Sequence, residues 1–99
     1  MEPKKLNDDE IEQLLTGLEH EWHLAPNDEL RRVYLFKDFG LAMKFVNKVA
    51  EAAEAENHHP DIVINYTKVT LTLATHSVGG LTEKDFSLAR QIDARTQTH

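Results

Sequence analysis

The stretch NHHPDIVINY, residues 57–66, marks the point at which a helical pattern stops and a strand pattern begins. Pro60 disfavours helical backbone at the residue before it and holds that residue in an extended conformation. His58 and His59 are therefore expected at a junction between two elements, where side chains can reach a cleft. Imidazole is the side chain best suited to proton transfer near neutral pH. The junction is thus the first candidate for a functional site.

The residues before this junction predict one long amphipathic helix. Asp38 is a favourable N-cap, and the helix is expected to end near Asn57. Phe45 lies off the apolar stripe of this helix. The stripe itself follows helical spacing and consists of Phe39, Ala42, Met43, Val46, Val49, Ala50 and Ala53.

Strand patterns lie on both sides of the helix. After it, residues 61–66 and 68–75 alternate in side-chain character, which predicts a β-hairpin with a tight turn. Before it, residues 30–36 predict a strand, and residues 22–24 predict a shorter extended segment. His76 follows the hairpin directly and is expected to close its second strand.

Helices are also predicted near both ends of the chain. Asn7 and Glu10 have the spacing of a capping box, and a stripe of apolar residues follows them. Thr82 and Asp85 have the same spacing at the start of the last helix. The element order is then α-β-β-α-β-β-α. This order predicts an α+β fold, a single four-stranded antiparallel sheet covered on one face by three helices.

Length and composition restrict the function classes. The 99 residues are expected to form a single domain, residues 1–99, and the net charge of −6 argues against a non-specific nucleic-acid or acidic-lipid surface. No window approaches the roughly 18 apolar residues of a membrane span. The N-terminal residues carry no secretory signal pattern, and the chain has no cysteine. A cytoplasmic protein without disulfides is therefore expected.

Five polar residues form a candidate constellation around the hairpin. The start of one hairpin strand lies beside the end of the other, so His76 should lie near His58 or His59. Glu54 precedes His58 by one helical turn, and Asp85 lies in the first turn of the last helix. Histidines with nearby carboxylates can relay protons.

Simpler interpretations exist for several of these residues. Capping alone would explain Asp85, and an exposed helix end would leave Glu54 solvated. Trp22 is typical of a core or rim aromatic residue, although a flat ring ligand would suit it. A metal site at His58 and His59 is less favoured, because adjacent side chains in extended backbone point to opposite faces. A helical histidine pair at i, i+4 and cysteine ligands are also absent from the sequence.

The spacing of these residues carries a resemblance to a known family. Three residues separate Glu54 from His58-His59-Pro60, five more lead to Tyr66, nine to His76 and eight to Asp85. This pattern resembles the signature of the pterin-4a-carbinolamine dehydratases. The resemblance covers roughly residues 20–95 and includes Trp22, Phe36-Lys37-Asp38-Phe39, Lys68-Val69, Thr75 and Gly80-Leu81-Thr82.

The resemblance implies a specific reaction and a role for each site residue. Members of the family dehydrate 4a-hydroxytetrahydropterin to quinonoid dihydropterin, which recycles the cofactor of aromatic amino-acid hydroxylases. His58 and His76 match the acid/base histidines, and Glu54 would steer an imidazole tautomer. The substrate-binding positions would be His59, Pro60, Thr75, Asp85 and Trp22.

The resemblance also implies what the protein associates with. The pterin is the substrate, and the family needs neither a metal nor another cofactor. Its members join sheet edges, commonly into dimers that assemble into tetramers, so a homodimer or homotetramer is expected. The net charge and the lack of a long apolar window, in turn, predict no direct contact with nucleic acid or membrane. The alternative function is a non-catalytic interaction module, since some animal relatives also bind a homeodomain transcription factor and stabilise its dimer.

Overall fold

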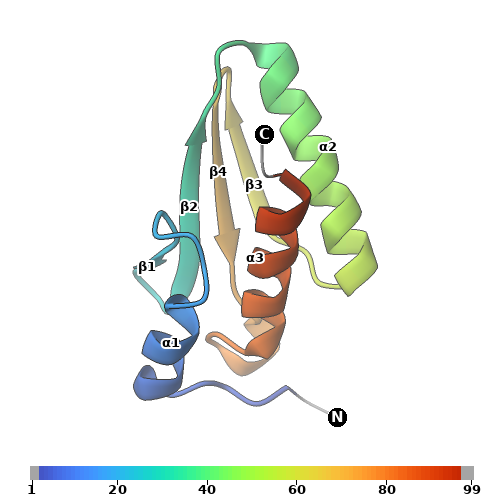
Figure 1. Ribbon diagram of the computed structural model, residues 1–99. Coiled ribbons are helices and arrows are strands. Elements are labelled where there is room, and N and C mark those ends of the chain that lie inside the picture. The colour runs from blue at the N-terminus through green and yellow to red at the C-terminus, as the bar shows by residue number, and fades with distance from the viewer. Residues whose placement is uncertain (1–2, 97–99) are drawn as a thin grey trace.

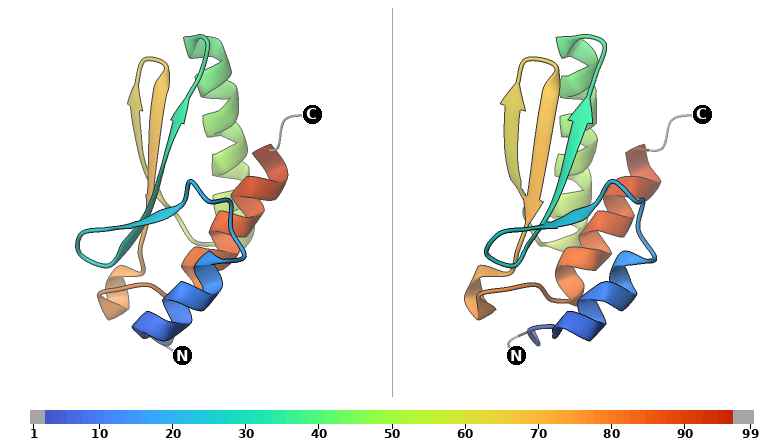
Figure 2. Two further views of the ribbon diagram at one scale, coloured as in Figure 1. Left: turned by 60° about the vertical axis from the view of Figure 1, so that its left-hand side comes forward. Right: turned by 90° about the vertical axis from the view of Figure 1, so that its left-hand side faces the viewer.

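Helices cover one face of a four-stranded antiparallel sheet in the computed structural model, which describes residues 3–96 (Figure 1). In the left-hand view of Figure 2, α2 and α3 lie on the same side of the strands. The strand order is β1-β2-β4-β3, and every pairing is antiparallel. The elements are α1 (Asp8–Leu15), β1 (His23–Ala25), β2 (Glu29–Leu35), α2 (Phe39–Glu56), β3 (Asp61–Asn65), β4 (Lys68–Leu73), the 3-10 helix η1 (His76–Val78) and α3 (Glu83–Thr96). The predicted α+β fold and element order are confirmed.

Helix α2 begins and ends where the sequence indicates. The Asp38 side chain accepts a hydrogen bond from the backbone N–H of Leu41 at 2.8 Å. At the other end Asn57 adopts left-handed backbone, with φ 51° and ψ 43°, and its N–H bonds back to the helix carbonyls. Asparagine tolerates this conformation better than most residues, which explains why the helix stops here.

The buried face of α2 differs from the predicted stripe. Phe45 is only 7% exposed, whereas Phe39 is 47% exposed. The centre of the Phe45 ring lies 4.3 Å from that of Tyr34, in β2, and 5.1 Å from that of Phe36, the residue that follows β2. The helix also packs against α3. Because α2 contacts both the β2 aromatic residues and α3, its buried face differs from the stripe predicted by helical spacing alone.

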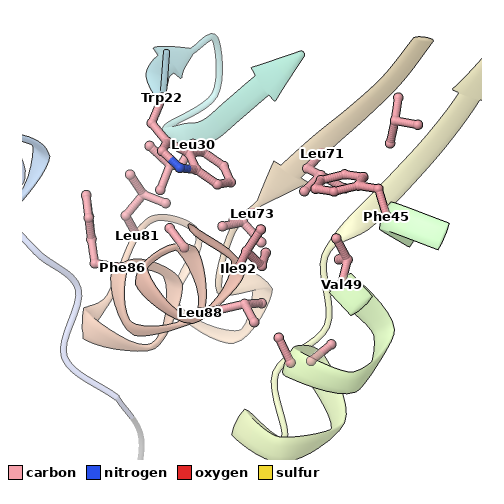
Figure 3. Packing of buried hydrophobic residues seen from close by; sticks show 14 of the residues in the cluster. Trp22, Leu30, Phe45, Val49, Leu71, Leu73, Leu81, Phe86, Leu88 and Ile92 are labelled. Carbon is pink, nitrogen blue, oxygen red and sulfur yellow. The ribbon is translucent and has the colours of Figure 1, made fainter. Parts of the chain in front are cut away.

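The core lies between the sheet and the helices α2 and α3 (Figure 3). On α3, the inner face consists of four fully buried residues, Phe86, Leu88, Ala89 and Ile92. From the sheet, alternating β4 residues and one β2 residue meet this face. The fully buried members of the core include Leu30, Val69, Leu71, Leu73, Leu81, Phe86, Leu88, Ala89 and Ile92.

The hairpin of β3 and β4 has the predicted pairing but a shorter second strand. Asp61 pairs with Thr72, and Asn65 pairs with Lys68. The prediction that His76 closes the second strand is wrong, because β4 ends at Leu73 and His76 opens η1. The cause is a tight turn around Thr75. Its N–H donates to the Gly80 carbonyl at 2.9 Å, and its carbonyl accepts bonds that fold the following residues back.

Candidate active site

Three segments of the chain meet at one end of the sheet. They are the exit from α2, the turn after β4, and the first turn of α3, all toward the lower end of the molecule in Figure 1. The left-handed turn at Asn57 directs the chain from α2 toward β3. The tight turn after β4 then directs it toward α3. These turns place His58, Thr75 and Asp85 in one hydrogen-bonded group.

Asp85 is the centre of this group and is completely buried. Its Oδ1 lies 2.6 Å from Nε2 of His58. Its Oδ2 accepts hydrogen bonds from the Thr75 hydroxyl at 2.8 Å and from the Thr82 backbone N–H at 3.0 Å. The bond to Thr82 N–H is the predicted capping interaction. Asp85 therefore caps α3 with one oxygen and holds the His58 imidazole with the other.

His58 joins this buried group to the surface. Its side chain is 13% exposed, so one edge of the ring is accessible while Nε2 faces the buried carboxylate. An imidazole held by a carboxylate is oriented for proton transfer. The arrangement is chemically suited to general acid/base catalysis at the remaining ring nitrogen.

His59 and Glu54 form a second pair nearer the solvent. Nε2 of His59 lies 2.6 Å from Oε2 of Glu54, and their side chains are 57% and 77% exposed. The glutamate that was expected to steer an imidazole thus contacts His59. The two adjacent histidines have different carboxylate partners, as their opposite directions predict.

His76 and Pro60 flank the group without entering its hydrogen bonds. His76 is exposed at the start of η1, immediately after Thr75. Pro60 lies in the irregular segment between α2 and β3. Both residues are close in sequence to a member of the group, so they lie at the same end of the sheet.

Trp22 lies in the core, away from the hydrogen-bonded group of His58, Thr75 and Asp85. It is 4% exposed and lies beside Leu30 in the core (Figure 3). Its indole N–H donates to the Asp93 carboxylate at 2.9 and 3.1 Å. Asp93 is eight positions beyond Asp85 on α3, which is about 12 Å along a helix. The structure therefore does not bring Trp22 into the hydrogen bonds of the histidine group.

Asp93 belongs to a second polar cluster that the sequence analysis missed. It also accepts a bond from Arg32 at 3.1 Å, and the Arg32 guanidinium lies 4.5 Å from the centre of the Tyr34 ring. Burial raises the pKa of Asp93, opposed by the Trp22 bond, the Glu19 backbone N–H and Arg32. Burial also raises the pKa of the Tyr34 phenol well above its usual range. The sequence signal that could have indicated this cluster is Arg32, a charged residue on the core face of a strand.

A cleft of about 550 Å³ adjoins this second cluster. Glu19, Arg32, Tyr34, Phe36 and Asp93 are among its lining residues, and none of the histidines is. Within residues 3–96, no three His, Cys, Asp or Glu side chains are grouped so as to hold a metal ion. No helix in the same range is long and apolar enough to cross a bilayer.

Comparisons with known proteins place this architecture in one structural class. The crystal structure described as a transcriptional coactivator/pterin dehydratase from Brucella melitensis superposes with a TM-score of 0.87 at 35% identity. It covers 95% of this chain and 100% of that one. A pterin dehydratase-like protein described as a RuBisCO assembly factor in the alpha-carboxysome shares the fold at a TM-score of 0.65 and 23% identity, covering 81% of this chain and 94% of that one. The fold is that of the pterin dehydratase-like proteins.

Sequence comparison defines the family. The model of the pterin 4 alpha carbinolamine dehydratases matches residues 4–95, and the chain belongs to this family. A relative in Cyanothece sp. is 52% identical over 87 residues, covering 88% of each chain. A relative in Acidobacterium capsulatum is 56% identical over 85 residues, covering 85% of this chain and 89% of the relative. Both relatives are provisionally named pterin-4-alpha-carbinolamine dehydratases.

Proposed function

We propose that this protein dehydrates 4a-hydroxytetrahydropterin to quinonoid dihydropterin and water, in the recycling of a tetrahydropterin cofactor. The observation that carries the proposal is the His58–Asp85 pair, a partly exposed imidazole held at 2.6 Å by a fully buried carboxylate. Membership of the dehydratase family and the complete set of histidines support it.

The reaction needs an acid and a base on one edge of the pterin. Hydroxide leaves C4a and is protonated to water, while the proton on N5 is removed. The electron pair of the N5–H bond then forms the N5=C4a double bond. His58 and His76 supply this proton transfer in the proposal, in either assignment of acid and base. His59, oriented by Glu54, binds the pterin ring beside them.

The test is the decay of freshly prepared 4a-hydroxytetrahydropterin, followed by absorbance with and without the purified protein. Wild type should accelerate the decay. His58→Ala and His76→Ala should each lower the catalysed rate at least about 100-fold, the lower bound for a positioned acid or base. His20→Ala is the matched control, because His20 is a highly exposed histidine distant in sequence from the site. Unchanged turnover in both site variants would refute the proposal.

His59→Ala separates binding from chemistry. Because His59 is proposed to hold the ring, this variant should raise KM with little change in kcat. A loss confined to kcat would reverse the roles of His58 and His59.

The proposal includes self-association through sheet edges. Strand β3 pairs only with β4 in the described chain, so its outer edge offers unpaired backbone groups. Val63 and Ile64 on this strand are also partly exposed. Sedimentation equilibrium should give the mass of a dimer or tetramer, and a monomer at micromolar concentration would exclude this part of the proposal.

A non-catalytic interaction module is the second candidate. The Brucella melitensis structure, 35% identical, is described as a transcriptional coactivator as well as a pterin dehydratase. The decay assay distinguishes the two, because a pure interaction module would leave the spontaneous decay rate unchanged.

A further inference from the structure

We propose that Thr82 and Thr75 act as a hydroxyl relay, a chain of two side-chain hydroxyls that positions Asp85 and thereby leaves Nδ1 of His58 to exchange the proton with substrate. Thr82 and Thr75 are positioning residues in this proposal, since both are buried and act through Asp85. The inference rests on the proposed function for its catalytic consequence, but its structural part stands on the geometry alone.

The number of protons on each hydroxyl fixes the direction of the hydrogen bonds in the relay. The Thr75 hydroxyl donates to Oδ2 of Asp85 at 2.8 Å. A hydroxyl has one proton, so the 2.8 Å contact between the Thr75 and Thr82 hydroxyls must have Thr82 as its donor. The Thr82 oxygen in turn accepts the backbone N–H of Lys84 at 3.2 Å. The chain therefore runs in one direction, from the first turn of α3 to the carboxylate.

The carboxylate then fixes the protonation of the His58 ring. With the Thr82 N–H added, two donors face Oδ2, and Oδ1 remains for His58. A carboxylate only accepts hydrogen bonds, so Nε2 of His58 must carry a proton. Nδ1 is the ring nitrogen that gains or loses its proton. The relay acts by keeping the carboxylate from rotating, because rotation would break the bonds to Thr75 and Thr82.

Sequence reasoning had assigned Thr82 to helix capping and Thr75 to substrate binding. The structure shows that the two hydroxyls bond to each other and that the Thr75 hydroxyl also donates to Asp85. Capping alone would require the Thr82 oxygen as an acceptor, which it is toward Lys84. It would not require the Thr82 hydroxyl proton to point at Thr75. That second bond is the feature that joins the cap to the site.

The first experiment observes the imidazole without any substrate. Protein labelled with 15N-histidine is examined by long-range 1H–15N correlation at pH about 8.5, where ordinary imidazole is neutral. Wild-type His58 should show the Nε2–H tautomer. Thr75→Val removes the donor to Asp85 with little change in shape, and should lower the tautomer preference about tenfold, as expected for a lost bond to a charged group. Thr82→Val should act in the same direction but less strongly, while Thr75→Ser and Thr82→Ser should restore the wild-type spectrum.

The second experiment measures dehydration by the same variants. Thr75→Val should lower kcat about tenfold with KM nearly unchanged, and Thr75→Ser should recover most of the loss. Asn7→Ala is the control for simple destabilisation. It removes the cap of α1, where the Asn7 side chain accepts from the Glu10 N–H at 2.8 Å, and it should leave kcat unchanged.

The outcomes separate the two proposals. An Nδ1–H tautomer in wild type, or an unaltered tautomer in folded Thr75→Val and Thr82→Val, overturns the relay whatever the activity. Wild type that fails to dehydrate the pterin overturns the proposed function, and the spectra still decide the relay. A kcat loss of equal size in Asn7→Ala would show that general destabilisation is responsible, which also overturns the relay.

Discussion

Replacing Asp85 by asparagine changes one oxygen of the site to an NH₂ group and keeps the shape of the side chain. The amide oxygen is most favourably placed at Oδ2, where it continues to accept from Thr75 and Thr82. The NH₂ group then faces Nε2 of His58, at the position now 2.6 Å from a carboxylate oxygen. Two donors cannot share that contact, so His58 must shift its proton to Nδ1.

The expected loss follows from what His58 contributes. With its proton on Nδ1, the neutral ring cannot accept a proton there as a base, and the amide NH₂ group facing Nε2 opposes the doubly protonated ring that an acid needs. The contribution of one positioned acid or base is about 10²–10⁴-fold. Asp85→Asn should therefore lower kcat at least about 100-fold. The reversed orientation of the amide would keep His58 bonded but would oppose Thr75 and Thr82 with a donor. Either orientation loses a hydrogen bond to a charged group, so unfolding should become easier by about 1.5–3 kcal/mol.

The assay combines kcat and KM for dehydration, urea unfolding, and the 15N spectrum of His58. Asp93→Asn is the matched control, because it changes a mostly buried carboxylate on the same helix without touching the histidine group. It should alter stability and leave kcat near wild type. Asp85→Asn that retains full activity together with the Nε2–H tautomer would refute the reasoning. A loss of kcat of equal size in Asp93→Asn would refute it as well.

Three further predictions concern stability. Burial raises the pKa of Asp93 above its ordinary 3.8, so the folded chain holds the carboxyl proton more tightly than the unfolded chain does. The free energy of unfolding therefore falls as pH rises from the unfolded pKa through the folded pKa of Asp93. Asp93→Asn lacks this titration, so its urea midpoint relative to wild type should improve as pH rises from about 4, and a constant difference would contradict the assignment. Gly79 has φ +67° with open space where a Cβ would lie, whereas the three atoms nearest to a Cβ at Gly80 all belong to the flexible Lys5 side chain. Thermal unfolding should therefore show a loss of about 1 kcal/mol in Gly79→Ala and a smaller one in Gly80→Ala, and the reverse order would contradict the strain argument. Phe45→Ala should cost about 3–5 kcal/mol in urea unfolding, while Phe39→Ala, at an exposed position of the same helix, should cost much less, and equal losses would favour the stripe drawn from sequence.

Local signals in the sequence were sufficient for most of the fold. Capping residues and the change of period at residues 57–61 depend on neighbours within about one helical turn, so each could be recognised where it stands. The errors occurred where distant contacts decide the outcome. Phe45 is buried because β2 aromatic residues meet it, and β4 stops early because Thr75 bonds to Gly80.

The sequence was sufficient to predict which segments of the chain meet at the candidate site. Hairpin geometry correctly put the turn after β4 beside the exit from α2. The pairings within the neighbourhood were not predictable, since they depend on backbone direction at single residues. Left-handed backbone at Asn57 ends the helical phase. Glu54 therefore meets His59, although helical spacing alone would point it toward His58.

The second cluster shows a different limit of local reasoning. Arg32 and Asp93 lie 61 positions apart, and Trp22 and Asp93 lie 71 positions apart. No periodicity within a helix or strand links such residues. Arg32 could be recognised as a charge on the core face of a strand, but the identity of its partner required the packing of α3 on the sheet.

Asp85 both caps α3 and holds His58, and these two roles affect how a catalytic relative can be distinguished from a non-catalytic one. A carboxylate at this position stabilises the first turn of α3, both by accepting the Thr82 N–H and by lying at the positive end of the helix dipole. A family member that had lost catalysis would still gain stability from the Thr82–Asp85 pair. Retention of that pair therefore does not distinguish an enzyme from an interaction module. The Glu54–His59 pair is exposed and contributes little to stability by comparison, and His76 is exposed at the start of η1. Retention of these exposed residues needs a reason other than folding, so they favour the catalytic function for this chain.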